Sequence, residues 1–377
     1  MPRVAFVHDW LTGLRGGEKC LERLIRLFPD CEIFTLFHRK GSTSPTIESR
    51  PIQPSWLQHL PGWRRYYRYL LPLFPRAARW KIEDCDLVVS LSHCVAKSAI
   101  APVGVPHVCY CFTPMRYAWH MKDQYFGTSR SLKDRVRDRL LSSLREWDRT
   151  TSNRVDHFVA ISKTIAKRIH ESYDRDSEVI FPPVDTDFYR PAPVTREDYY
   201  LVVSALAPYK RIDLAIEACQ RVNRNLVIIG TGQDEQKLKA KAGGNVTWLG
   251  WQPDSVIRHH MQTCRALIFP GEEDFGIVPV EAQACGAAVI AFGRGGATET
   301  IAGLGNSANP TGLFFSEQSS ESLAEALLRF EARRGEFDPN AARLTAMDFS
   351  ADRFDEKISN YLAAVLARRT FRHSRAA

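Results

Sequence analysis

Two glutamates in the stretch EEDFGIVPVEAQACG (272–286) stand where side chains can hold a ligand. The preceding CRALIFPG (264–271) is a short apolar run closed by Pro-Gly, which predicts a buried strand and then a turn. Glu273 should therefore lie on a loop. Proline is tolerated at the first position of a helix, so we predict that Pro279 begins a helix with Glu281 in its first turn. Both carboxylates would then lie at the carboxyl edge of a strand, where open α/β sheets bind ligands.

Each of the two glutamates could also have an ordinary structural role and bind no ligand. A glutamate in a first helical turn can serve only to complement the helix dipole, and a loop glutamate can simply be solvated. Lys210, in PYKRIDLAIEA (208–218), lies at a predicted turn between a strand and a helix, where its charge and the helix dipole could meet an anion. Arg211 could assist Lys210 or be a surface residue.

Composition indicates an ordinary globular protein of two domains. The chain has 377 residues, 44% hydrophobic and 25% charged. It has no apolar run near the ~20 residues of a membrane span, and MPRVAFVHDWL is too short and too quickly polar for a signal peptide, so we expect a cytoplasmic protein. Nine scattered cysteines without a CxxC pair suggest neither disulfides nor a zinc site, and we predict no metal.

The order of apolar runs predicts two α/β domains, residues 1–190 and 191–377, joined by the proline-rich stretch 179–198. A last helix at about 352–368 could cross back to the first domain. Predicted strands are 3–10, 31–37, 86–92, 107–112, the start of 157–173, 199–206, 225–230 and 264–271; predicted helices are 17–29, about 131–150, the end of 157–173 and 211–222.

Positive charge is concentrated in the first half of the chain. Residues 1–190 hold 30 Lys and Arg against 21 Asp and Glu, whereas residues 191–377 hold 21 against 22. Such asymmetry suggests an anionic partner for the first half: nucleic acid, an anionic lipid surface or a phosphorylated substrate. The segment 56–81 interleaves aromatic residues with arginines, including Arg64, Arg65 and Arg68, which suits a membrane surface. The alternative is a helix pair packed on the domain with its basic face in water.

Two short patterns carry less information. Gly16-Gly17 at a predicted helix start could cradle a phosphate or let an acceptor approach, or be a tight turn. These glycines do not form G-x-G-x-x-G, so a nicotinamide site is not supported. The Asp-Thr-Asp at 185–187 resembles a metal-binding triad, but it lies in the predicted linker.

The stretch EDFGIVPVEAQACGAAVIAFGRGG resembles the E-x7-E signature of retaining glycosyltransferases with the GT-B fold, whose donors are nucleotide-diphosphate sugars. Other landmarks agree along nearly the whole chain: VHDWLTGLRGGEK, TPMRYAW, VDHFVAISK, VIFPPVD, PYKRIDLAIEA and NVTWLGW. The sequences of these motifs most resemble those of bacterial mannosyltransferases of polysaccharide and O-antigen assembly. The resemblance implies two Rossmann-like domains whose parallel sheets face a central cleft, with the acceptor in the first domain and the donor in the second.

The resemblance also implies roles for individual residues. Glu273 would reach the donor sugar, Glu281 would hold the two ribose hydroxyls, and Lys210 would meet the charge that grows on the leaving diphosphate. Glu273 and Lys210 are thus the expected catalytic residues. The expected donor-binding set is Lys210, Arg211, Glu273, Phe275, Gly276, Ile277, Val278 and Glu281, and the expected acceptor or phosphate loop is Gly16 and Gly17.

Two positions depart from the family pattern. Ala205 stands where the family commonly has an arginine that clamps the diphosphate, and Phe112 stands where it commonly has a histidine near the reacting centre. His8 or His120 could substitute for that histidine.

From the resemblance we expect a metal-independent retaining glycosyltransferase, peripheral to the inner membrane face and without a cofactor. It would transfer a hexose, mannose from GDP-mannose, to a lipid-linked or saccharide acceptor in cell-surface polysaccharide synthesis, and would bind an anionic membrane but no nucleic acid. Two alternatives remain: a GT-B enzyme of another type, such as an epimerase or hydrolase, and a non-enzymatic protein that binds an anionic ligand.

Overall fold

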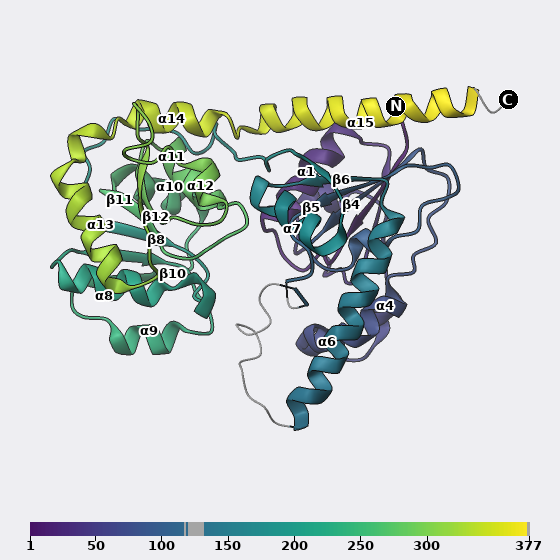
Figure 1. Cartoon of the computed structure of the whole chain (residues 1–377), viewed down its shortest axis with the longest axis horizontal. Coiled ribbons are helices and arrows are strands. Elements are labelled where there is room, and N and C mark those ends of the chain that lie inside the picture. Colours follow the sequence, from purple (N-terminus) through teal and green to yellow (C-terminus); the bar gives the residue numbers. More distant parts are fainter. Residues whose placement is uncertain (117, 120–131, 375–377) are drawn as a thin grey trace. The chain divides into compact units, whose positions relative to one another are not determined.

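A computed structural model of the chain describes residues 1–116, 118–119 and 132–374 (Figure 1). The chain divides into two compact units: Met1–Pro183 together with the chain from Phe354 onward, and Val184–Arg353. His120 lies outside the described residues.

The predicted linker is anchored on the second unit from Val184 onward. The Val184 N–H donates to the Phe349 carbonyl at 2.9 Å. The Arg343 guanidinium donates to the carbonyls of Thr186 (2.7 Å) and Tyr189 (2.8 Å). These bonds explain why residues 184–190 group with the second unit, although proline content suggested a free connection.

The described part of the first unit contains a parallel 7-stranded sheet in the order β3-β2-β1-β4-β5-β6-β7. Its strands are β1 Val4–His8, β2 Cys31–Thr35, β3 Ile52–Pro54, β4 Leu87–Ser92, β5 His107–Cys111, β6 His157–Ala160 and β7 Ser177–Val179. The order reverses direction between β1 and β4. In such sheets the loops that leave the carboxyl ends of those two strands diverge and form the usual ligand position.

Helices flank this sheet (Figure 1). They are α1 Gly16–Leu27, α2 Pro45–Glu48, α3 Trp63–Tyr66, α4 Phe74–Ala77, α6 Leu132–Thr151 and α7 Lys163–Tyr173, with 3-10 turns η1 Trp56–His59, η2 Tyr67–Leu73, η3 Ala96–Ser98 and η4 Ser152–Arg154. The start of α7 is set by Ser162, whose hydroxyl accepts a hydrogen bond from the Ile165 N–H at 3.1 Å. Its end is set by Asp174, in the left-handed conformation.

The second unit repeats this architecture with a parallel 6-stranded sheet, in the order β10-β9-β8-β11-β12-β13. Its strands are β8 Tyr200–Val203, β9 Leu226–Ile229, β10 Val246–Gly250, β11 Ala266–Phe269, β12 Ala288–Phe292 and β13 Gly312–Phe315. Its helices are α8 Ile212–Arg221, α9 Glu235–Lys241, α10 Asp254–Thr263, α11 Ile277–Ala284, α12 Ala297–Thr300, α13 Ser320–Ala332 and α14 Pro339–Met347, with η5 Pro208–Lys210 and η6 Arg334–Glu336. Here the order reverses between β8 and β11.

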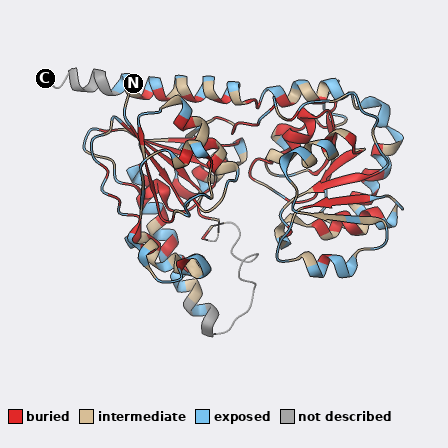
Figure 2. Cartoon of the chain, turned by 180° about the vertical axis from the view of Figure 1, so that it is seen from behind, coloured by how far each residue is buried: buried red, intermediate tan, exposed pale blue. Residues whose placement is uncertain are grey.

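The inner strands of both sheets are buried on both faces, as their continuous apolar runs require, whereas the edge strands β3, β7 and β10 are partly exposed (Figure 2). In the second unit, alternate residues of the strands pack with the apolar sides of α8 and α13 into one core. In the first unit, one core joins the sheet to the chain around α3 and α4. None of the nine cysteines, all of which lie within the described residues, forms a disulfide, and eight are buried.

The last helix, α15 Ala351–Ser374, starts in the second unit and then packs on the first. The Phe354 ring meets the Tyr110 ring with centroids 5.8 Å apart, and the Arg23 Nε donates to the Asp355 carboxylate at 3.1 Å. Ile358 and Leu362 are buried on the same helix face.

Candidate functional site

Lys210 lies where the sequence placed it, directly after β8. It ends the short turn η5, and Arg211 follows in the left-handed conformation (φ 53°), which redirects the chain into α8. Arg211 turns to its own helix, since its guanidinium lies 3.3 Å from the Asp213 carboxylate. Ala205 is exposed in the same loop. Within this loop, Lys210 is the cation that points to a residue of another element.

That residue is Glu273, on the loop after β11. The Lys210 ammonium donates a hydrogen bond to Glu273 Oε1, so the two side chains form an ion pair. They are 16% and 25% exposed, which leaves the pair reachable from solvent. The Tyr209 ring lies 5.3 Å from the Lys210 nitrogen. Because β8 and β11 are the strands at which the sheet order reverses, this pair occupies the usual ligand position of the sheet.

Glycines hold the loops of this edge in backbone contact. A Cβ on Gly271 would lie 3.1 Å from the Lys210 Cα and from the Tyr209 carbonyl. A Cβ on Gly295 or Gly296, after β12, would collide with the backbone of Glu273 to Phe275. The Gly296 N–H also donates to the Glu273 carbonyl at 2.8 Å. The loops after β8, β11 and β12 therefore fix one another.

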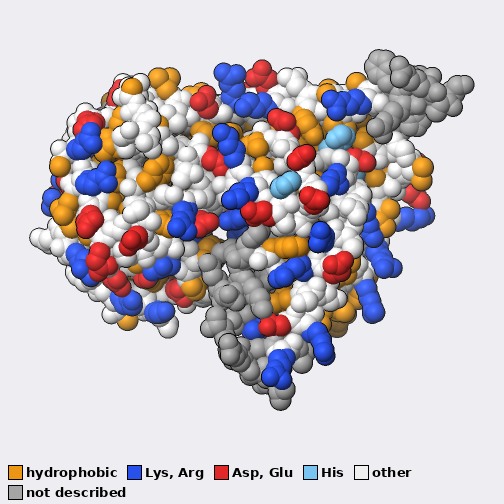
Figure 3. All heavy atoms as spheres, in the orientation of Figure 1, with side chains coloured by type: hydrophobic (Ala, Val, Ile, Leu, Met, Phe, Trp, Pro, Cys, Tyr) orange, Lys and Arg blue, Asp and Glu red, His pale blue; other side chains and the backbone are white. Residues whose placement is uncertain are grey.

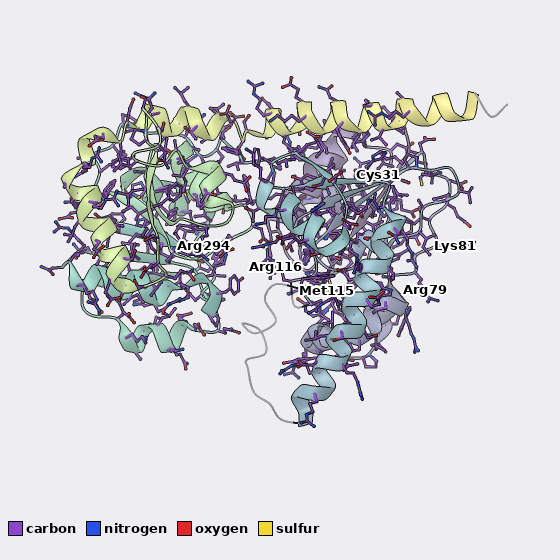
Figure 4. The ribbon with its side chains drawn as sticks, viewed as in Figure 1. Cys31, Arg79, Lys81, Met115, Arg116 and Arg294 are labelled. Carbon is purple, nitrogen blue, oxygen red and sulfur yellow. The ribbon has the colours of Figure 1, made fainter. Side chains whose placement is uncertain are left out.

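Arg294 is a residue that our sequence analysis missed. It is exposed on the loop after β12, between Gly293 and Gly295 (Figure 4). Its guanidinium lies 5.7 Å from the Phe292 ring. The signal in the sequence was the Gly-Arg-Gly-Gly run, since glycines on both sides of a charged residue allow a close backbone approach.

The helix that follows Glu273 starts earlier than predicted. α11 runs from Ile277 to Ala284, so Pro279 is its third residue and Glu281 its fifth, outside the first turn. The prediction that Pro279 begins the helix was wrong because proline is accepted throughout a first turn, where amides lack helical partners. The first-turn amides of α11 have no carbonyl partner within the helix and point along its axis at its N-terminal end, where such groups can bind an anion.

Gly276 is needed for its backbone conformation. It caps α11 with φ +89°, a region that other residues rarely adopt. A Cβ there would make only ordinary contacts, 3.4–3.5 Å from Pro279 and Phe269. Phe275 is buried with its ring 5.7 Å from the Phe349 ring, whereas Ile277 and Val278 are half-buried. Of this stretch, only the backbone and the partly open side chains of Ile277 and Val278 remain near the surface.

Glu281 is buried, with 7% of its surface exposed. Burial and then the charge of Glu281 raise the pKa of the Tyr189 phenol well above its usual range, so the two groups are near neighbours. A carboxylate in this setting is costly unless hydrogen-bond donors meet it. This burial argues against Glu281 serving merely as a solvated helix-dipole partner.

The predicted glycine loop of the first unit lies at the start of α1. Gly16 is the first residue of the helix. A Cβ on Gly17 would lie 3.3 Å from both His8 Nε2 and the Phe112 ring. Gly17 therefore lets the helix start approach the carboxyl ends of β1 and β5. The imidazole of His8 and the ring at position 112 are thus brought together.

The basic segment 56–81 divides into a buried and an exposed part. Trp63 and Trp80 are core residues: Trp63 stacks on Phe37 with centroids 5.0 Å apart, and Trp80 donates to the Thr35 carbonyl at 3.2 Å. These two tryptophans therefore do not belong to a surface, although the sequence pattern grouped them with one. Arg64 and Arg65 are exposed and Tyr69 is 84% exposed; the side chain of Arg68 lies outside the described residues. Figure 3 shows further Lys and Arg side chains over the first unit.

Two family models match consecutive parts of the chain. Glycosyltransferase Family 4 matches residues 14–188, and Glycosyl transferases group 1 matches residues 185–344. The chain belongs to the glycosyltransferases of the GT-B fold. The two parallel α/β sheets and the GT-B structures that resemble them confirm the predicted fold class.

Among solved GT-B structures, HepE of Anabaena in complex with UDP has a TM-score of 0.72 and 16% identity, covering 96% of this chain and 100% of that one. A GDP-mannose-dependent alpha-(1-6)-phosphatidylinositol monomannoside mannosyltransferase of Mycobacterium tuberculosis is 29% identical over 40% of this chain and 45% of its own length. Human Alpha-1,3/1,6-mannosyltransferase ALG2 is 24% identical over 97% of this chain and 96% of its own. The chain spans about half the length of several curated relatives that it matches.

Two features are absent from the described residues: a membrane-spanning helix and a metal-binding cluster. No helix within 1–116, 118–119 and 132–374 is long and apolar enough to cross a membrane. Within the same residues, no group of three or more His, Cys, Asp or Glu side chains is arranged to hold a metal ion. In the Asp-Thr-Asp stretch at 185–187, the Asp185 carboxylate accepts a hydrogen bond from the Phe188 N–H at 2.9 Å, as in an ordinary turn.

Proposed function

We propose that this GT-B glycosyltransferase transfers a hexose, mannose from GDP-mannose, to a saccharide or lipid-linked acceptor with retention of configuration. The observation that carries the proposal is the Lys210–Glu273 ion pair at the reversal between β8 and β11. A nucleotide-sugar donor offers a diphosphate for the cation and sugar hydroxyls for the carboxylate. The retaining mechanism and the E-x7-E roles come from the family resemblance.

The pair has a specific part in this proposal. Without a donor, each charge compensates the other. When the diphosphate binds, Lys210 exchanges Glu273 for a phosphate oxygen, and Glu273 is left to accept hydrogen bonds from the sugar. The amides at the start of α11 add donors where charge grows on the leaving group. Glu281 accepts hydrogen bonds from the ribose hydroxyls. The exposed Arg294 supplies the second cation, in place of the arginine that the family commonly has where this chain has Ala205.

Comparisons with named proteins support the choice of donor. HepE is described in complex with UDP, and the M. tuberculosis relative is named as GDP-mannose-dependent. Several other relatives are named mannosyltransferases, including the O-antigen chain mannosyltransferase C of Escherichia coli. These names support a nucleotide-sugar donor as a class and GDP-mannose within it.

The test is a donor panel. Tritiated GDP-mannose, UDP-glucose and UDP-galactose are each incubated with the protein and with methyl mannoside or a bacterial lipid extract. We expect transfer from GDP-mannose alone, with the α-configuration of the donor kept in the product by NMR. Transfer from a UDP-sugar would correct the donor. Donor conversion without an acceptor product would favour an epimerase or hydrolase, and no conversion of any donor would favour the binding-protein alternative.

We also propose that the surface around Arg64, Arg65 and Tyr69 binds anionic membranes. Each exposed basic residue near such a surface contributes about 1 kcal/mol, screened by salt. We expect Arg64→Ser/Arg65→Ser/Arg68→Ser to weaken co-sedimentation with phosphatidylglycerol vesicles. The matched control replaces three exposed arginines of α6, Arg135, Arg139 and Arg149, by serine. Equal losses in both variants would mean that net charge, and not this surface, causes binding.

A further inference from the structure

The carboxyl edge of the first sheet holds a buried carboxylate with an unusual set of partners. Asp9 follows β1 and is fully buried. Its two oxygens accept hydrogen bonds from the backbone N–H groups of His93, Cys94, Val95 and Ala96, at 2.6, 2.9, 2.6 and 2.8 Å. These amides follow β4, the strand at which the sheet order reverses. The carboxylate therefore fixes the loop after β4 in one position.

The same carboxylate fixes the His93 ring. Asp9 Oδ2 lies 2.9 Å from His93 Nδ1. Because the carboxylate can only accept, Nδ1 carries a hydrogen, so Nε2 is the nitrogen through which the neutral tautomer can accept a hydrogen bond. The ring packs against Trp10 at 4.5 Å and Phe112 at 6.5 Å between centroids. With 29% of its side chain exposed, His93 is held in orientation yet reachable.

A second imidazole lies beside it. His8, the last residue of β1, is 1% exposed, and its Nδ1 donates to the Trp10 carbonyl at 3.0 Å. Burial lowers the pKa of His8, so its Nε2 is also an acceptor. Among the described residues, none forms a hydrogen bond with this nitrogen. It is directed at the first turn of α1, since a Cβ on Gly17 would lie 3.3 Å away.

We propose that this cluster is an acceptor-hydroxyl site, in which His93 Nε2 accepts a hydrogen bond from a sugar hydroxyl and Asp9 acts as the positioning residue. Two hydrogen-bond acceptors, a buried carboxylate and the buried Glu18 of α1 disfavour an anion and suit a neutral donor of hydrogen bonds. The rings of Trp10 and Phe112 supply the apolar surface that sugar-binding sites combine with a few polar groups. The assignment of a sugar rests on the proposed function.

Binding is tested without catalysis. Methyl α-mannoside is titrated into 15N-labelled protein, and the histidine ring nitrogens are followed by long-range 1H–15N spectra. The His93 signals are identified from their loss in His93→Asn. We expect the Nε2 resonance of His93 to shift when the sugar binds. Asparagine keeps a donor to Asp9 but has no acceptor at the Nε2 position, so His93→Asn should weaken sugar binding about tenfold.

Kinetics supply the second readout. We expect His93→Asn to raise the acceptor KM or lower kcat about tenfold, His93→Gln to recover part of the loss, and donor affinity to stay unchanged. His170→Asn, on the exposed face of α7, is the matched control. Sugar binding and acceptor kinetics equal to wild type in His93→Asn would overturn the proposal, as would an equal loss of donor affinity or a lowered Tm. Sugar binding that depends on His93 in a protein without transfer activity would keep this site and reject the proposed function.

Discussion

The two sheets reverse their strand order in the same way, yet the residues at the two reversals are held differently. In the second unit, Lys210 and Glu273 pair side chain to side chain and both are partly exposed. In the first unit, Asp9 is buried and four backbone amides hold it. A pair of flexible charges can exchange partners with a charged ligand, whereas a carboxylate fixed by backbone can only orient its neighbours. One topology thus carries an ion pair that can exchange partners in one unit and a rigid, backbone-held carboxylate in the other.

The largest difference should appear in stability. Asp9→Ala leaves four buried amides without an acceptor, so we expect the first unit to lose about 3–5 kcal/mol of unfolding free energy. Glu273→Ala, at a partly exposed pair, should cost less than about 1 kcal/mol. Urea unfolding of both variants is the measurement. Similar costs in the two variants would remove the distinction between a backbone-held and a side-chain-held carboxylate.

For catalysis we expect the larger effect in the second unit. We expect Lys210→Ala and Glu281→Ala each to cost about 2–4 kcal/mol of transition-state stabilisation, roughly 30- to 1,000-fold in kcat/KM, with Lys210→Ala acting mainly on kcat. Arg211→Ala is the matched control, because Arg211 already pairs with Asp213. It should stay within about threefold of wild type. Near-wild-type activity of folded Lys210→Ala would show that the ion pair has no part in the reaction.

Asp9 should also make the stability of the first unit sensitive to acid. Burial alone would raise the pKa of Asp9, but its electrostatic and hydrogen-bonding interactions with His93 outweigh burial and lower the pKa to about 2. A lowered folded-state pKa contributes stability that is complete above the unfolded value of 3.8 and is lost as the pH falls through about 2. We expect a loss of about 2 kcal/mol between pH 5 and pH 2, measured by urea unfolding.

The acid effect needs a control that keeps the shape of the side chain. Asp9→Asn cannot ionise, so its stability, although lower, should lack this part of the pH dependence. An Asp9→Asn protein with the full wild-type slope between pH 5 and pH 2 would assign the acid sensitivity to other carboxylates.

The smallest effects concern the glycines. Gly276→Ala must adopt φ +89° and should lose about 1–2 kcal/mol of stability in the second unit. Gly244→Ala, at a position with open space and no left-handed backbone, should be neutral. Thermal unfolding compares the two. If Gly276→Ala were as stable as Gly244→Ala, the cap of α11 would not depend on glycine.

The sequence by itself determined most elements, because apolar runs and turn residues are local signals. β1, β4, β8 and β11 and the last helix all follow from them. Five of the described strands were not among the predicted ones. Ile52–Pro54 and Ser177–Val179 have three residues each, too few for a periodic pattern. Val246–Gly250, Ala288–Phe292 and Gly312–Phe315 have five, five and four residues, and length does not explain why they were missed. Lys210 and Glu273 were chosen from their places after predicted strands and from the family resemblance, and both places hold in the structure.

Only the tertiary structure decided which of these residues meet. Glu273 reaches Lys210 across 63 positions, and Asp9 reaches the His93 amide across 84, because parallel strands bring the loops at their carboxyl ends to one edge. The tertiary structure also decided which side chains are buried. Trp63 and Arg64 are adjacent in an aromatic and basic segment, yet the tryptophan stacks inside the core and the arginine remains in solvent. A local pattern records residue types, whereas the direction in which each side chain points is set by the packing of distant elements around it.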